Sequence, residues 1–245
     1  DWETLFLITT FGAIVLTPFV RNDLAQIFSS IDTLKLLFFV SGMMLVTALF
    51  DFEALKRGKI AVVEPIMAIE VPIAAILAFI MLNDAITTMQ AVIIAVLLVG
   101  LILVSLRAHH LAKRVWLEHG VILAIIGSIF MGASNFIVGL ASRITNPLVT
   151  NWFLSMIIAV VSFLYLLWKN RARQLFQDLK QYPTLILTVS TFDNLAWIAF
   201  AFSMALIPIA IAVAISESYI ALAAFLGLII NKEKLMMHQK TGLAI

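Results

Sequence analysis

Long apolar runs alternate with short polar segments along nearly the whole chain. A bilayer core about 30 Å thick is crossed by about 20 apolar residues in an α-helix. The runs that are long enough cover residues 4–20, 34–52, 60–82, 88–106, 117–140, 149–168, 184–206 and 208–230, and another begins at 241. They are continuous rather than alternating, which is typical of helices and not of a transmembrane barrel. The pattern predicts an all-α polytopic membrane protein with eight complete spans and the start of a ninth.

The amino-acid composition agrees with this prediction and argues against several kinds of binding partner. Hydrophobic residues make up 63% of the chain and charged residues 12%, whereas soluble domains hold about 45–50% and about 25%. The absence of cysteine excludes disulfides and thiolate metal sites. A formal net charge of +2 gives no reason to expect a nucleic-acid partner. No cofactor and no bound metal are predicted, because no Walker loop and no metal-binding or nucleophile motif occurs.

The basic residues separate by side when the polar segments are assigned alternately to the two faces of a membrane. Of the 16 Lys and Arg residues, only Arg21, Lys35 and Arg143 fall on one face. The positive-inside rule places the other, basic face in the cytoplasm. If the number of predicted spans were wrong, the basic residues would not separate between the two faces in this way. The distribution of charge therefore supports the predicted number of spans. We expect an integral protein of the bilayer, and the location we predict for it is the plasma (inner) membrane of a prokaryote.

One segment of the chain occurs twice. The stretch from Ala54 to Gln90 returns from Ala205 to Gln239. Both copies open with Ala-Leu, continue through an apolar run that carries glutamate, and end in a polar turn with an acid, Asp84 or Glu233. The two acidic turns fall on opposite faces of the predicted topology. This indicates an inverted-topology repeat, a common build of secondary transporters, which handle substrate near the midplane between the repeats.

The repeated segments also carry a resemblance to a known family. ALKRGKIAVV followed by LNDAITTMQ in the first half, and ALIPIAIAVAI followed by NKEKLMMHQ in the second, resemble the EamA-type transporters of the drug/metabolite transporter superfamily. The resemblance implies two inverted repeats of five helices each. Residues 1–106 would form the first repeat without its first helix, 107–116 a basic linker, and 117–245 the second repeat with its last helix truncated.

Three acids interrupt the apolar runs. Glu70 is expected at the middle of 60–82, Glu217 near the middle of 208–230, and Asp193 near the middle of 184–206. An ionised acid at the bilayer centre costs about 2.5–3.5 kcal/mol on insertion scales, and no Lys or Arg lies at that depth in the predicted spans. These acids therefore bind protons or a cationic substrate, or they are neutral acids hydrogen-bonded to a neighbouring helix. The sequence leaves both interpretations open.

Helical spacing predicts which way two of the polar residues face. Glu217 shares a face with small residues, and small residues allow helices to approach closely, so we expect Glu217 to face protein or a central cavity rather than lipid. The same spacing places Asn135 beside Ser128, Gly132 and Gly139. For Asn135, a substrate contact and an interhelical hydrogen bond are equally compatible with the pattern.

Further candidates for the pathway are weaker. Glu64 and Glu70 flank prolines in one predicted helix, and locally broken helices often mark transporter sites, although a simple kink fits as well. Other candidate lining residues are Asn194, Trp197 and Tyr219. Trp152 is expected to be an interfacial anchor. Asp51 and Glu53 close a span at the basic face, where pairing with Lys56 or Arg57 is expected.

Together these observations favour a secondary transporter over an enzyme. We predict that it moves a small organic metabolite or drug by alternating access, with export as the favoured direction and protons as the candidate coupling ion. The alternatives are a membrane-embedded enzyme acting on a lipid-linked substrate and a non-transporting membrane scaffold or sensor. An enzyme of that kind needs a constellation of acids, His or Arg at the membrane surface, whereas the acids here are predicted at mid-depth. The substrate and the oligomeric state are not specified by the sequence.

Overall fold

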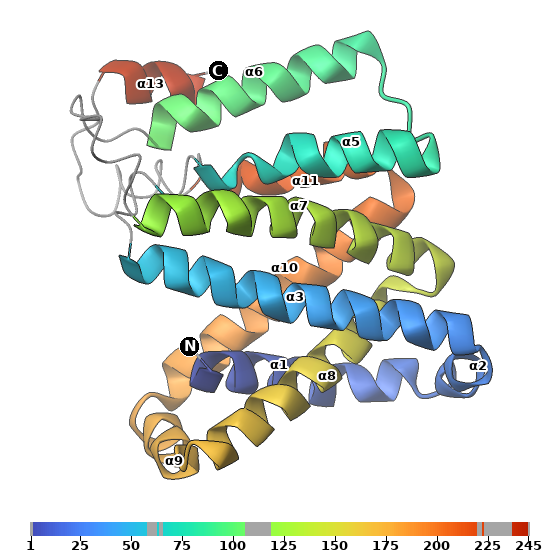
Figure 1. The fold of residues 1–245 in the computed structure, drawn as a ribbon, viewed down its shortest axis with the longest axis vertical. Coiled ribbons are helices and arrows are strands. Elements are labelled where there is room, and N and C mark those ends of the chain that lie inside the picture. Colours follow the sequence, from blue (N-terminus) through green and yellow to red (C-terminus); the bar gives the residue numbers. More distant parts are fainter. Residues whose placement is uncertain are drawn as a thin grey trace. The chain divides into compact units, whose positions relative to one another are not determined.

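A computed structural model describes residues 2–57, 63, 66–105, 119–219, 222 and 237–244, and these residues are mostly α-helical with short turns between the helices (Figure 1). Within these residues there is no strand. The helices are α1 (Trp2–Val20), α2 (Leu24–Ser29), α3 (Ile31–Arg57), α5 (Glu70–Leu82), α6 (Thr88–Ser105), α7 (His119–Ile144), α8 (Pro147–Trp168), α9 (Ala172–Gln181), α10 (Pro183–Leu206), α11 (Ile209–Glu217) and α13 (Met237–Ala244).

Several of these helices can cross a membrane. Among the described residues, α1, α3, α7, α8 and α10 are long and apolar enough to span a bilayer. The helix α5 and the Thr88–Gly100 part of α6 are apolar but shorter. The prediction of an all-α polytopic membrane protein is therefore confirmed.

Two compact units make up the chain, and each takes segments from both halves of the sequence. The first unit contains Asp1–Leu45 and Ile137–Leu206. The second unit contains Val46–Phe136 and Ile207–Ile245. The candidate residues are therefore divided between two packed bodies, which are described separately below. The repeat boundaries derived from the sequence remain a prediction.

The first unit is built around α1, which packs against α8 and α10. The rings of Trp2 and Tyr165 stack with their centroids 4.1 Å apart. The indole nitrogen of Trp152 donates a 2.9 Å hydrogen bond to the Thr17 hydroxyl. Because Trp152 is only 9% exposed, its prediction as an interfacial anchor is wrong. The reason is that its polar edge finds a partner on a neighbouring helix rather than at a headgroup.

The second unit is built around α5, α11 and the first part of α7. The helix α11 packs against α5 and α6, and α13 packs against α6. On the other side of α7, the end of α3 approaches closely. There the Thr47 and Ser134 hydroxyls are hydrogen-bonded at 2.9 Å, and the rings of Phe50 and Phe130 stack with centroids 5.5 Å apart.

Two of the predicted continuous spans are interrupted in this unit. The span predicted over 60–82 contains a turn at Ala68 and Ile69, and α5 begins only at Glu70. The span predicted over 208–230 contains α11, which ends at Glu217 and is followed by a turn at Ser218. Each glutamate, predicted near the middle of its apolar run, therefore lies at a helix end.

Candidate functional site

The helices α5 and α11 lie side by side and run in opposite directions (Figure 1). At one end of the pair, the carboxylate of Asp84, just after α5, accepts a hydrogen bond from the backbone N–H of Ile209 at 3.1 Å. At the other end lie Glu70, the first residue of α5, and Glu217, the last residue of α11. The antiparallel arrangement therefore brings together the two glutamates that the sequence places in opposite halves of the chain.

Pro72 explains why α5 begins where it does. A proline has no N–H, so the hydrogen bond that Ala68 would receive from the residue four positions later is missing. The Ala68 carbonyl accepts instead from the N–H of Val71 at 3.2 Å, one residue earlier. The turn is tied to α7 because the Ser128 hydroxyl donates to the Ile66 carbonyl at 3.0 Å. Pro72 itself lies in the first turn of α5, where a missing donor costs nothing.

The side chains of Glu70 and Glu217 lie close enough for their charges to interact. Both are buried, with 7% and 9% of their surface exposed. A carboxylate only accepts hydrogen bonds, so a hydrogen bond between two carboxyl groups requires one of them to carry a proton. Two ionised carboxylates buried this close repel each other, and one proton shared between them would remove that repulsion. Asp51, on α3, adds a further negative charge to the surroundings of Glu70.

Asn135, on α7, is the third residue of this group and contacts Glu70. Its amide nitrogen donates a 3.0 Å hydrogen bond to Glu70 Oε1. Its amide oxygen is buried and meets no hydrogen-bond donor among the described residues. A close approach of α7 to α5 makes this possible, because a Cβ on Gly132 would lie 2.7 Å from the Glu70 carbonyl oxygen and 2.7 Å from Ile73 Cβ. Gly132 is therefore required to let Asn135 reach the pair.

Burial of Glu217 agrees with the face predicted for it. Ala214 and Ala210, one and two turns before it on the same face, are each 2% exposed. Tyr219, by contrast, is 53% exposed. Glu64 lies outside the described residues. Of the predicted site residues in the second unit, the structure thus brings together Glu217, Glu70 and Asn135.

The remaining candidates belong to the first unit. Asp193 is half-buried on α10. Asn194 donates both amide hydrogens to backbone carbonyls, at 3.0 Å to Ile8 and at 2.8 Å to Ser190. The ring of Trp197 packs edge-on against Phe200. For Asn194 these contacts favour a structural role, because its donors already hold α10 against α1.

Sequence reasoning did not connect two further acids with the site. Of the ion pairs expected at the basic end of α3, Glu53 pairs with Arg57. Asp51 also lies near Glu70, which was not predicted. Asp84 was recognised only as a repeated motif, and no feature of the sequence indicated that it meets Ile209.

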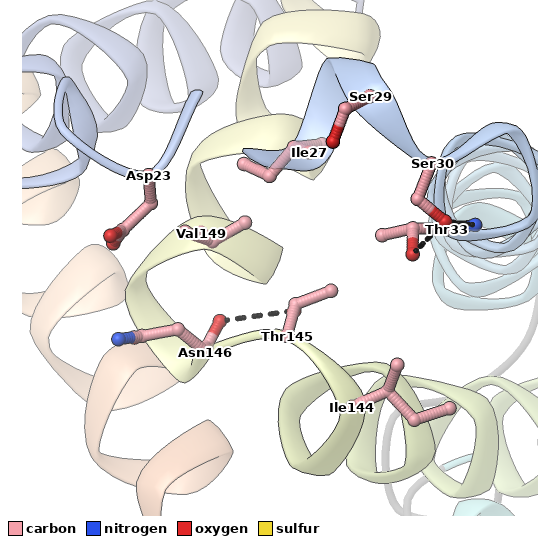
Figure 2. A pocket seen from close by; sticks show the side chains of 9 residues that line it. All are labelled: Asp23, Ile27, Ser29, Ser30, Thr33, Ile144, Thr145, Asn146 and Val149. Carbon is pink, nitrogen blue, oxygen red and sulfur yellow. Dashed lines mark hydrogen bonds between the residues drawn. The ribbon is translucent and has the colours of Figure 1, made fainter. Parts of the chain in front are cut away.

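A separate pocket of about 440 Å³ opens in the first unit, between α2 and the turn that joins α7 to α8 (Figure 2). In the view of Figure 2, Asp23 and Asn146 lie on one side and Ser30 and Thr33 on the other, with apolar Ile27 and Val149 between them. Ser30 and Asn146 cap helices, since they accept from the backbone N–H of Thr33 at 3.4 Å and of Leu148 at 2.8 Å. The pocket is polar, but its side chains are largely engaged in the local fold.

Metal binding finds no support in the described part of the chain, where no three His, Cys, Asp or Glu side chains are grouped as metal ligands. Comparison with known proteins gives one clear result. The EamA-like transporter family matches residues 1–106 and 118–245, which is nearly the whole chain. A search of curated proteins finds no match.

Proposed function

The chain belongs to the EamA-like transporter family, and from this premise we propose that it is a proton-coupled secondary transporter that exports a small organic metabolite or drug. The coupling group is the carboxyl pair of Glu70 and Glu217. The single observation that carries the proposal is that two buried glutamates, the first residue of α5 and the last residue of α11, meet where the two helices end. A pair that holds a proton in its closed form must exchange that proton when its surroundings change.

The position of the pair supports a role at the centre of the membrane. Glu70 begins α5 and Leu82 ends it, a length of about 18 Å along the axis. Glu217 lies about 12 Å along α11 from Ile209. Both distances are close to half of a hydrocarbon core of about 30 Å. Interrupted helices at this depth are the usual setting of substrate and ion sites in secondary transporters.

Alternating access supplies the movement that the buried pair needs. With 7% and 9% exposure, neither carboxyl exchanges freely with bulk water in the arrangement observed. Movement of the two predicted repeats would open the pair to one side of the membrane and then to the other. The protein then acts in the plasma membrane of a prokaryote, with the basic loops in the cytoplasm.

Transport by the purified full-length protein in proteoliposomes tests the proposal. Labelled amino acids, nucleosides, polyamines and cationic drugs are offered with and without a proton gradient. We expect at least one solute to move faster with the gradient, and Glu217→Gln to remove the gradient-dependent part. Glu53→Gln, which changes an acid paired with Arg57, serves as the matched control. Gradient-dependent transport at the unsubstituted rate in Glu217→Gln would contradict the coupling role.

A further inference from the structure

The segment that joins α8 to α9 is a sharp corner with a defined geometry (Figure 1). The N–H of Asn170 donates to the Leu167 carbonyl at 3.0 Å. The next N–H, of Arg171, donates to the Leu166 carbonyl at 2.9 Å. These two bonds form a Schellman motif, and Asn170 takes the left-handed conformation that the motif needs, with a φ of 55°. The Arg171 side chain is paired with buried Glu3 at 3.0 Å, so the start of α9 is tied to α1.

The corner lies at the membrane surface. The helix α8 has 22 residues, which at about 1.5 Å per residue gives about 33 Å, close to a hydrocarbon core of about 30 Å. Trp168 ends α8 and is 73% exposed, and Tyr182 directly precedes α10 and is 50% exposed. Exposed Trp and Tyr rings at the ends of transmembrane helices lie at the depth of the lipid headgroups. Between them, α9 is a surface helix on the predicted cytoplasmic face.

The helix α9 is amphipathic, and its basic residues lie on one flank. Arg173 and Lys180 are both exposed and are seven residues apart, so they share a side of the helix. Leu175 is packed into the protein at 4% exposure, whereas Leu179 is 41% exposed. The only acid in the α9 sequence is Asp178, and about 100° of rotation per residue places that position about 140–160° around the helix from both basic residues. One flank of α9 therefore carries only positive charge.

A third cation is fixed at the same depth by an aromatic ring. Lys169 Nζ lies 4.3 Å from the centroid of the Trp168 ring, a cation–π contact. In the described part of the chain no carboxylate pairs with Lys169, Arg173 or Lys180, and all three are exposed. Three other basic residues are each paired with an acid, namely Lys35, Arg57 and Arg171. The corner therefore presents cations at headgroup depth without acids to neutralise them.

We propose that Trp168, Lys169, Arg173, Lys180 and Tyr182 form a docking surface for the anionic phospholipid headgroups of the cytoplasmic leaflet. A lipid phosphate offers charged oxygen acceptors to the Lys and Arg donors. The anionic lipids of this leaflet attract basic segments beside transmembrane helices. The surface is separate from the carboxyl pair, since its residues belong to the first unit and Glu70 and Glu217 to the second. It binds lipid whether or not the protein moves a solute.

Fluorescence quenching on the protein in phosphatidylcholine vesicles tests this surface. The chain has no cysteine, so Gln177→Cys carries a single fluorophore at an exposed position of α9. The quencher is a nitroxide close to the headgroup, carried by phosphatidylglycerol or by phosphatidylcholine at the same mole fractions. We expect phosphatidylglycerol to be preferred at least about fivefold, which is the contribution of one basic residue near an anionic surface. Salt at about 1 M, where the Debye length is about 3 Å, should largely remove the preference.

Two double variants of the labelled protein locate the preference. Arg173→Gln with Lys180→Gln should lower the preference for phosphatidylglycerol at least about fivefold. Lys35→Gln with Lys240→Gln removes the same two charges from exposed positions on α3 and α13, and it should leave the preference unchanged. The comparison of the two lipids without these substitutions does not depend on how the variants fold.

Four outcomes would overturn the proposal. Equal quenching by the two lipids shows no selection for anionic headgroups, and a preference that persists in high salt is not electrostatic. Weak quenching by both lipids means that another protein surface covers α9. Relief of the phosphatidylglycerol quenching by inorganic phosphate means that the site takes a free anion rather than a lipid. An equal loss of preference in both double variants means that net charge, and not this corner, attracts the lipid.

Discussion

The carboxylate of Asp84 and the backbone nitrogen of Ile209 are hydrogen-bonded at 3.1 Å across 125 positions of the chain. Ile209 is the first residue of α11, and its cap position is Pro208, which supplies no side-chain hydrogen bond. A negative side chain at this end satisfies a free N–H and complements the helix dipole. Asp84 therefore fixes where α11 starts relative to the end of α5. This sets the register that places Glu217 against Glu70 at the far ends of the two helices.

Replacing Asp84 should loosen this register. Asp84→Ala removes a charge-assisted hydrogen bond at a helix N-terminus, so we expect a loss of about 1 kcal/mol of stability. The measurement is the thermal unfolding midpoint of the purified protein in detergent. Glu53→Ala, which removes a partner from a surface ion pair with Arg57, should cost only about 0.3–0.5 kcal/mol. An Asp84→Ala midpoint that matches or exceeds that of Glu53→Ala would rule out the register role.

Gly132 should tolerate no side chain. The Cβ of Gly132→Ala would lie within 2.7–2.8 Å of the Glu70 carbonyl oxygen and of Ile73, so α7 must move away from α5. Overpacking of this kind costs about 1–3 kcal/mol, and it should weaken transport because Asn135 moves with α7. Thermal unfolding and proteoliposome transport are both measured on the variant.

Gly42→Ala is the matched control for Gly132→Ala. A Cβ there meets no described atom within 4 Å, and alanine is the better helix former by about 0.5–1 kcal/mol. We expect the Gly42 variant to be as stable as the unsubstituted protein or more so. If the Gly132 and Gly42 variants have the same stability and the same transport rate, the close approach of α7 to α5 at Gly132 is not required.

Asn194 and Asn135 should respond differently to substitution. Asn194 uses its two N–H groups on the carbonyls of Ile8 and Ser190, and its amide oxygen lies where a Cβ on Gly12 would be. Asn194→Ala should therefore lower stability by about 1–2 kcal/mol and leave the order of preference among transported solutes unchanged. Competition between solutes in proteoliposomes checks this. A changed order of preference among the solutes would indicate that Asn194 contacts the substrate and does not have only a structural role.

Composition and periodicity were sufficient to predict the helical membrane fold. A continuous apolar run indicates a transmembrane helix, because backbone N–H and C=O groups in lipid must be hydrogen-bonded within the same segment. This requirement can be assessed from each run by itself. The burial of Glu217 was also predictable, since spacing relative to Ala210 and Ala214 is a property of one helix. These features depend only on neighbours in the chain.

The interruptions at Glu70 and after Glu217 were not predicted as helix ends. Hydropathy alone does not distinguish a continuous span from two shorter helices. Pro72 gave a partial signal at α5, because it removes the donor to Ala68, but the sequence AISESY in the second copy contains no proline. The contacts of Asp84 with Ile209 and of Asn135 with Glu70 join residues 125 and 65 positions apart. Such contacts follow from packing, which a single sequence does not specify.

The most direct measurement of the central claim is proton-driven transport by Glu70→Gln, Glu217→Gln and the double variant, compared in proteoliposomes at equal protein content. If the two carboxyls hold one shared proton, they act as a unit, and coupling within a unit is not additive. We predict that each single substitution abolishes the gradient-dependent rate and that the double variant loses nothing more. Single variants that each keep a substantial gradient-dependent rate, with the two losses multiplying in the double variant, would contradict the account.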